Sequence, residues 1–411
     1  MKSALRNGPL RHHAFLIYQG VRLLSVNAIQ MMSVAIGWQL YERTEDPMAL
    51  GMAGIAQFAP LMILSPIAGD VADRFDRRTV IAACHAGIAV CATLFVWIFS
   101  SPDVGVGPVY AVLVLFGCAR AFAGPASQAL LPALVPPAEL AQGIAMGSST
   151  FQIATITGPT IGGLMIDRWG GTSVYATSAV LEVVVVGMLI AMRYSPERLS
   201  RTGGGVERLL AGVRYVRSRP VILGAISLDL FAVLLGGAVA LMPIYARDIL
   251  HVDEWGLGLL RSAPAVGAGV VALFLAFRPL RRRAGLVMFV SVALFGVATI
   301  VFGVSTSLPL SLAALALLGA TDMVSVVIRQ TVVQIATPPE MRGRVAAVNM
   351  VFIGASNELG DAESGLTAAW FGVVPAVVIG GVGTLLVTAI WAFLFPALRD
   401  VDRLDEHDAQ R

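Results

Sequence analysis

Four of the carboxylates that lie inside long, mainly apolar runs in the second half of the chain are candidates for chemistry. Asp229 and Asp322 are each the only acid in their run, whereas Glu358 and Asp361 share another run. Runs of this length are typical of membrane helices, where a central charge costs roughly 2.5–3.5 kcal/mol. Carboxyl groups in an apolar cavity can exchange protons near neutral pH. The four acids are therefore candidates for proton coupling, and a buried salt bridge is the alternative for each.

Their spacing places these residues on defined helix faces. Asp322 and Arg329 are seven residues apart, which puts them on one face and makes them a candidate pair or relay. Glu358 and Asp361, three residues apart, share a face of their own helix. We also expect Arg329 to contribute to a substrate cavity.

The first apolar run offers three polar groups to such a cavity, namely Arg22, Asn27 and Gln30. Arg22 would either bind an anionic substrate or neutralise an acid across the cavity. Arg261 lies near the end of its run, where a long side chain can reach the water interface. We interpret Glu182, in the sixth run, as structural.

The composition requires a membrane to surround these runs. The chain has 411 residues, of which 57% are hydrophobic and only 13% are charged, and its mean hydropathy is +0.79. A soluble domain carries about a quarter charged residues to coat its surface. The net charge of +3 is too small to indicate nucleic-acid binding. Most of the outer surface must therefore face lipid.

Twelve apolar runs are long enough to cross a bilayer, which needs about 20 residues each. They lie near 15–41, 48–69, 79–100, 107–130, 140–166, 172–193, 220–246, 255–277, 285–305, 308–334, 345–369 and 373–396. With both termini inside, the inner segments carry 22 basic residues and the outer loops carry three, Arg43, Arg168 and Arg247. The positive-inside rule then places both termini in the cytoplasm. We expect a monomeric, multi-pass protein of the bacterial inner membrane.

The two halves of the sequence repeat. Pairs of residues recur at an offset of 202 to 204 positions: Tyr41 with Tyr245, Gly117 with Gly319, Gly158 with Gly360, and Gly170 with Gly372. Parallel repeats of this kind place the substrate site between two similar halves. The predicted fold is an all-α polytopic protein with two pseudo-symmetric six-helix halves. Its expected parts are a first half (1–193), a cytoplasmic linker with an amphipathic helix (194–219), a second half (220–396) and a cytoplasmic tail (397–411).

The loop after the second run resembles a motif of the major facilitator superfamily, Gly-x-x-x-Asp-Arg-x-Gly-Arg-Arg. The matching residues are Gly69, Asp73, Arg74, Arg77 and Arg78. Asp76 stands where that family usually has Gly. The resemblance implies the major facilitator fold and a cytoplasmic gate in which Asp73 and Arg77 latch the halves. An ordinary basic inner loop would explain the arginines alone.

Two further motifs carry the same resemblance. Arg120 followed by Gly124 resembles an intramembrane pattern that the family associates with proton coupling, and a structural tether is the alternative. The residues Gly158, Pro159, Gly162 and Gly163 resemble the antiporter motif found mainly in exporters. Proline bends a helix and glycine permits close backbone contact, so we expect a hinge in the fifth helix.

Longer stretches resemble the branch of enterobactin exporters and macrolide efflux proteins. They are 120–132, 341–345 and 356–365. This resemblance implies secondary-active export of a small amphipathic molecule, either a drug or a siderophore, by proton antiport. Two alternatives stay open: a proton-symport importer on the same fold, and a non-transporting membrane sensor.

The sequence lacks the signatures of several other activities. It has no Gly-x-x-x-x-Gly-Lys-Ser/Thr loop for ATP and no Gly-x-Ser-x-Gly elbow. Its five histidines show no spacing typical of metal ligands. We therefore expect no enzyme, no cofactor and no metal site. The expected partners are the lipid bilayer, a small-molecule substrate and protons.

Overall fold

The computed structural model describes residues 9–193, 205–278 and 282–402. Expectations for the start of the chain, for 194–204 in the linker and for the end of the tail lie outside these residues. Contacts divide the chain into two compact units, one made of residues 1–43 with 56–205 and the other of residues 44–55 with 206–411. In the described part of each unit, every element of secondary structure is a helix.

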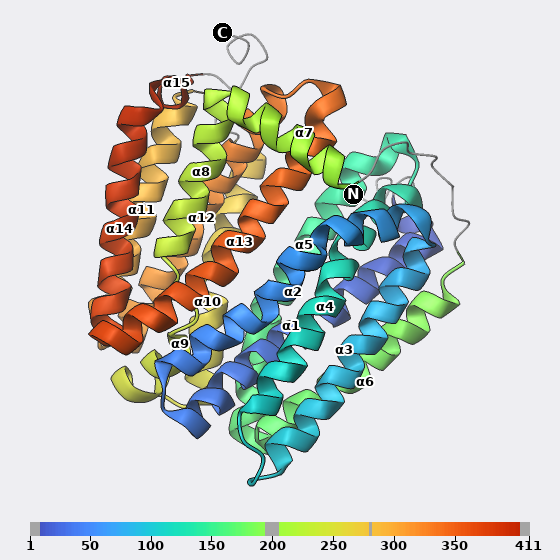
Figure 1. Ribbon diagram of the computed structural model, residues 1–411, viewed down its shortest axis with the longest axis vertical. Coiled ribbons are helices and arrows are strands. Elements are labelled where there is room, and N and C mark those ends of the chain that lie inside the picture. The colour runs from blue at the N-terminus through green and yellow to red at the C-terminus, as the bar shows by residue number, and fades with distance from the viewer. Residues whose placement is uncertain (1–8, 194–204, 279–281, 403–411) are drawn as a thin grey trace. The chain divides into compact units, whose positions relative to one another are not determined.

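The first unit takes its helices from the first half of the sequence (Figure 1). They are α1 (His13–Thr44), most of α2 (Pro47–Arg74), α3 (Arg77–Ser100), α4 (Gly107–Leu130), α5 (Leu140–Trp169) and α6 (Gly171–Ala191), with short turns at Pro9–Arg11, Leu131–Leu134 and Pro137–Glu139. The second unit holds the remaining helices. They are α7 (Gly205–Ser218), α8 (Pro220–Leu235), α9 (Met242–Ile244), a π-helical turn (Tyr245–Ile249), α10 (Glu254–Phe277), α11 (Ala284–Val304), α12 (Leu308–Ile335), α13 (Pro339–Phe371), α14 (Val373–Leu394) and α15 (Pro396–Arg399).

Twelve segments correspond to the twelve predicted membrane helices. Nine helices of the described part are long and apolar enough to cross a membrane by themselves. The other three segments are α5, α8 and α13. Helices α5 and α13 are long but rich in Gly, Ser, Thr or charge, and α8 has only 16 residues. Polar membrane helices of this kind are expected where a helix packs inside the protein instead of facing lipid.

The seventh predicted helix is broken, whereas the sequence suggested one run over 220–246. Helix α8 ends at Leu235, and residues 236–241 form turns before α9. Two successive glycines, Gly236 and Gly237, favour the break because glycine is a poor helix former. The carbonyl of Gly237 then accepts a hydrogen bond from Ser364 Oγ of α13 at 2.7 Å. The neighbouring helix α13 thus supplies a hydrogen bond to a backbone carbonyl that has lost its partner within the helix at the break.

The predicted amphipathic helix is α7, which meets α8 at a bend of 108°. Its Gly212 lies so near α13 that a Cβ there would come within 2.7 Å of the Arg344 carbonyl oxygen. The Tyr215 hydroxyl donates to the Ala336 carbonyl at 3.3 Å. Helix α7 therefore packs on the ends of α12 and α13.

Glycines that repeat between the halves make equivalent contacts in the two units. Gly117 of α4 abuts the backbone of Gln57 in α2, and Gly319 of α12 abuts the backbone of Pro264 in α10. A side chain at either glycine would collide with a carbonyl oxygen. The sequence repeat is therefore a structural repeat, in which the same helix pair is brought into close contact in each unit.

A second repeated pair closes two matching corners. Gly170, between α5 and α6, has φ +77° and ψ 160°, and Gly372, between α13 and α14, has φ +91° and ψ 161°. This backbone region is essentially restricted to glycine.

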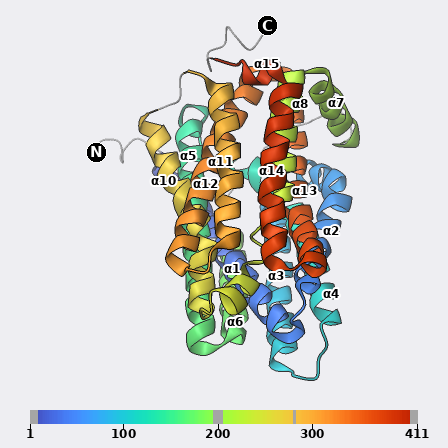
Figure 2. The same cartoon turned by 90° about the vertical axis from the view of Figure 1, so that its left-hand side faces the viewer.

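In the second unit, α11 lies against both α12 and α14, as Figure 1 and Figure 2 show.

Candidate functional site

A buried ion pair joins α8 to α12 in the second unit. Arg329 of α12 pairs through Nη1 with Asp229 Oδ1 of α8, and the two side chains are 3% and 11% exposed. The sequence suggested Asp322 as a partner for Arg329 because the two share a face, but the ion pair of Arg329 is with Asp229. A buried charge is tolerated when it is paired in this way.

Asp322 lies beside this ion pair. Its side chain is half-buried and lines a small cavity together with Asp229 and Ser325. The rest of the lining is apolar and comes from Ala232, Val233, Val292 and Phe295. Within the described part of the chain, no hydrogen bond or ion pair joins Asp322 to another protein group. The structure therefore brings two of the predicted acids together, one compensated by arginine and one not.

The other two predicted acids form a separate cluster on α13. Asp361 interacts electrostatically with Arg261 of α10 and with Glu358 of its own helix. Its Cβ lies 3.1 Å from the position of a Cβ at Gly54, in the part of α2 that belongs to the second unit. Arg261 was expected to reach the water interface, but it lies against this acid. The cluster therefore contains two carboxylates and one guanidinium.

In the first unit, Arg120 of α4 lies next to α2. Its Nη1 donates to Gln57 Oε1 at 3.5 Å, and its guanidinium carbon lies 5.6 Å from the centroid of the Phe116 ring. Gly124, one turn further on, is open, since a Cβ there would meet nothing within 4 Å. Both contacts lie within the first unit, and the role of Arg120, in coupling or as a tether, stays a prediction.

The polar groups of α1 face α5. The Asn27 amide oxygen accepts from Thr157 Oγ1 at 2.9 Å, and its Nδ2 donates to the Leu23 carbonyl at 2.8 Å. The Arg22 guanidinium lies against Gly147 of α5, 2.8 Å from the position of a Cβ there. Gln30, in turn, lies against Gly158 of the same helix. The three cavity residues predicted on α1 are thus all brought to the contact between α1 and α5.

The antiporter-like motif forms the other side of this contact. A Cβ at Gly158 would lie 2.6 Å from Gln30 Cβ, and one at Gly162 would lie 3.0 Å from Met31 Cα. Helix α5 continues through Pro159, and Gly163 is buried. The motif glycines therefore allow two helices to touch at backbone distance.

The predicted gate loop joins α2 to α3 and is tied to the ends of other helices in its unit. Arg77 Nη1 donates to the Ala129 carbonyl at 2.9 Å, and Arg78 Nη1 donates to the Met192 carbonyl at 2.7 Å. Arg74 is exposed and Gly69 has open space around it. The side chain of Asp73 lies outside what the structure describes.

Asp76 explains how the loop turns without the usual glycine. It has φ −60°, a value open to any residue, and its Oδ1 accepts from the backbone N–H of Arg78 at 2.9 Å. Asp76 is therefore the N-cap of α3, a position that Asp favours.

Replacing this cap tests its contribution to stability. Asp76→Ala should lower the free energy of unfolding by about 1 kcal/mol, since an unsatisfied helix N–H remains. Asp76→Asn keeps a side-chain acceptor and should lose far less. Thermal unfolding of the purified protein in detergent measures both, and equal losses in the two variants would argue against a capping role.

A buried pair that the sequence did not reveal joins α3 to α6. His85 Nδ1 and Glu182 Oε2 are 2.7 Å apart, and their side chains are 7% and 0% exposed. Glu182 was expected to be structural, and this contact pins two neighbouring helices. Little in the sequence indicated this pair, because His85 and Glu182 lie far apart along the chain.

Breaking this pair on one side should destabilise the first unit. His85→Leu leaves a carboxyl buried without its partner, which should cost about 3 kcal/mol. The double variant His85→Leu, Glu182→Leu removes both polar groups and should recover most of that loss. Thermal unfolding of the three proteins is the measurement. A double variant as unstable as the single one would mean that the pair itself contributes little to the loss.

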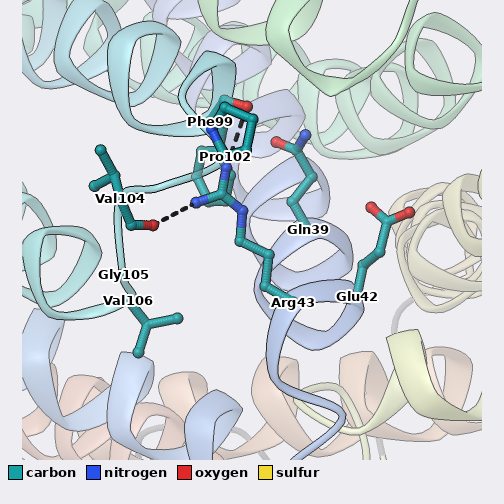
Figure 3. Close-up of a pocket in the computed structure, with 8 residues that line it drawn as sticks. All are labelled: Gln39, Glu42, Arg43, Phe99, Pro102, Val104, Gly105 and Val106. Carbon is teal, nitrogen blue, oxygen red and sulfur yellow. Dashed lines mark hydrogen bonds between the residues drawn. The ribbon is translucent and has the colours of Figure 1, made fainter.

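A wider cavity of about 540 Å³ lies where α1 ends and α3 joins α4 (Figure 3). Arg43 reaches across it and donates to the carbonyls of Val104, Ile98 and Phe99 at 3.1–3.2 Å. Its guanidinium also lies 4.7 Å from the centroid of the Phe99 ring. Arg43 thereby holds the α3–α4 connection in place.

Comparison with known proteins gives consistent matches over almost the whole chain. The family model described as Major Facilitator Superfamily matches residues 15–360. The enterobactin exporter EntS of Citrobacter koseri is 26% identical over 397 residues, covering 94% of this chain and 93% of that protein. The multidrug efflux pump Tap of Mycobacterium tuberculosis is 28% identical over 393 residues, covering 92% of both.

Solved structures share the fold at low sequence identity. A bacterial homologue of the human lysosomal transporter Spinster, in an inward-facing and occupied conformation, has a TM-score of 0.73 and 13% identity, covering 94% of this chain and 97% of that one. The nucleoside transporter NupG has a TM-score of 0.69 and 13% identity, covering 93% and 99%. At this identity the likeness concerns the fold alone.

Proposed function

Because the chain belongs to the Major Facilitator Superfamily, we propose that it exports a small amphipathic molecule, a drug or a siderophore, in exchange for protons. The support for export is that EntS and Tap, matched over more than nine-tenths of their length, are an exporter and an efflux pump. Transport by alternating access would move the substrate outward as protons move inward. In this proposal both termini are cytoplasmic and the transporter works as a monomer.

The observation that carries proton coupling is the position of Asp322. A membrane-embedded carboxyl without a compensating charge is expensive when ionised, so it binds a proton readily. Asp229, which pairs with Arg329, lines the same cavity. A change in the charge of Asp322 would therefore alter the electrostatic energy of this ion pair strongly. Asp322 is therefore the first candidate for the proton carrier.

The remaining candidates take secondary roles in the same proposal. Glu358 and Asp361 would form a second proton-binding cluster, and Arg120 would tune coupling from the first unit. Arg22, Asn27 and Gln30 would contact substrate where α1 meets α5. The gate residues Gly69, Asp73, Arg74, Arg77 and Arg78 would act at the cytoplasmic face. The hinge would consist of Gly158, Pro159, Gly162 and Gly163.

Transport in inverted membrane vesicles tests the direction and the coupling. Respiration acidifies the interior of such vesicles, so a proton antiporter that exports in the cell should accumulate its substrate there. A panel of dyes, antibiotics and siderophores serves as probe, with vesicles lacking the protein as the control. Uptake that an uncoupler abolishes supports the proposal. Accumulation only in right-side-out vesicles would instead support an importer.

Substitution of single acids tests the assignment of the proton carrier. Asp322→Asn should reduce pH-gradient-driven uptake about tenfold or more, because the carboxyl that binds the proton is gone. Glu363→Gln is the matched control, since Glu363 lies in α13 and its Oε1 already accepts from Thr367 at 2.8 Å. Full uptake by well-expressed Asp322→Asn, with the same for variants of Asp229, Glu358 and Asp361, would rule out these acids.

A further inference from the structure

The hydroxyl of Ser325 is a buried polar group whose hydrogen-bond partner should be a bound molecule. Ser325 of α12 is 5% exposed and lines the cavity beside Asp229 and Asp322. Hydroxyls of neighbouring buried residues return to their own helix: Thr321 donates to the Leu317 carbonyl at 2.9 Å. Among the residues that the structure describes, none is hydrogen-bonded to Ser325. Since buried hydroxyls nearly always have a partner, the partner should come from the cavity.

The size and lining of the cavity suit one water molecule. Its volume is about 10 Å³, and a single water needs roughly 10–15 Å³ of such space and two to four polar partners. Three polar groups line it, the carboxyls of Asp229 and Asp322 and the hydroxyl of Ser325. The apolar remainder of the wall would keep further water out.

The surrounding charges favour water over a metal cation. On α8, Asp229 already pairs with Arg329, so a second cation would be repelled by the guanidinium. Helix α11, which supplies part of the apolar wall, has no ionisable residue between Ala284 and Val304. On α10 the membrane-embedded ionisable residue is Arg261, which interacts with Asp361. Asp322 is thus the one carboxyl at this cavity that no positive group compensates in the described structure.

We propose that one water molecule, held by Ser325, bridges Asp322 and Asp229 and carries the proton between them. An O–H bond of Asp322 breaks as the water accepts its proton, and the water passes another proton to the Asp229 carboxylate. The water is regenerated, Asp322 becomes ionised and Asp229 becomes neutral. Ser325 acts as a positioning residue, because its hydroxyl fixes the water and does not itself exchange the proton.

The transfer would act on the ion pair between α8 and α12. Once Asp229 is neutral, its attraction for Arg329 is lost, and the contact that joins the two helices weakens. Protonation of Asp229 would thus allow α8 and α12 to move relative to each other within the second unit. This step deepens the proposed function and rests on it, since it gives a route for the proton that would drive export.

Infrared spectroscopy of the full-length protein in lipid tests the water without any substrate. The carboxyl band of protonated Asp322, assigned with Asp322→Asn, is titrated against pH, and the signal of bound water is identified by exchange into H₂¹⁸O. Ser325→Ala should remove the water signal and move the midpoint of the carboxyl band by about one pH unit, as expected for loss of about one hydrogen bond. Thr321→Val, on the same helix and with its hydroxyl already partnered, should change neither.

A second variant tests the cavity with the Ser325 hydroxyl in place. Val292→Ile enlarges a side chain in the wall of a cavity that has room for about one water molecule, and should displace the water and remove its signal. An unchanged water signal and an unchanged midpoint in both Ser325→Ala and Val292→Ile would overturn the proposal. Absence of pH-driven uptake by the wild-type protein would overturn the proposed function instead, and would leave the infrared result standing.

Discussion

Replacing Arg329 by Ala should lower the free energy of unfolding by about 3–5 kcal/mol, the cost of leaving one partner of a buried ion pair alone. Asp229→Ala should have a similar effect, because it leaves the guanidinium of Arg329 without its partner in a site where the side chain is only 3% exposed. Arg278→Ala, at the exposed end of α10, is the matched control and should be neutral. Thermal unfolding of the purified proteins measures the three effects.

The double variant Asp229→Leu, Arg329→Met separates stability from transport. It replaces the ion pair by apolar side chains and should regain most of the stability, because buried ion pairs are often no better than apolar packing. Transport in inverted vesicles should nevertheless stay abolished, since the charges that respond to a proton are gone. A double variant that is stable and transports fully would show that the ion pair has no part in coupling.

Gly319→Ala should strongly destabilise the contact between α10 and α12. A Cβ at Gly319 would lie 2.6 Å from Pro264 Cα and closer still to the carbonyl oxygen of that residue. Both sides of the contact are backbone, so α10 and α12 would have to move apart. Overpacking typically costs about 1–3 kcal/mol, and this contact should fall at the upper end.

The matched control for this change is Gly187→Ala in α6, where a Cβ would meet nothing within 4 Å. It should be neutral or slightly stabilising, because alanine is the better helix former. Size-exclusion profiles and thermal unfolding of both variants give the comparison. Equal stability of Gly319→Ala and the wild-type protein would mean that the helices yield without cost.

The glycine pattern in the sequence predicted contacts well, because glycine reports on backbone geometry. Gly117 and Gly319 were matched by position alone, and the structure places both against a neighbouring helix. The break after Leu235 was not predicted, since an apolar run carries no mark of where backbone hydrogen bonds go to another helix.

The ionic contacts of the site were harder to predict. Periodicity placed Asp322 and Arg329 on one face of a helix, but it could not show that Asp229, a hundred residues earlier, approaches that face. Arg261 was expected to reach water because it lies near a helix end, yet its neighbour Asp361 comes from another helix. Spacing defines faces, whereas partners depend on which helices pack together.

The two corner glycines have a consequence for genetic variation. Every missense change of a glycine codon by one base introduces a side chain, and neither Gly170 nor Gly372 has a backbone conformation that suits one. A saturation library selected for folded protein should therefore be depleted of variants at both positions, at the same offset that relates the halves. Alanine of the D configuration, introduced by chemical synthesis, would fit where its natural mirror image does not.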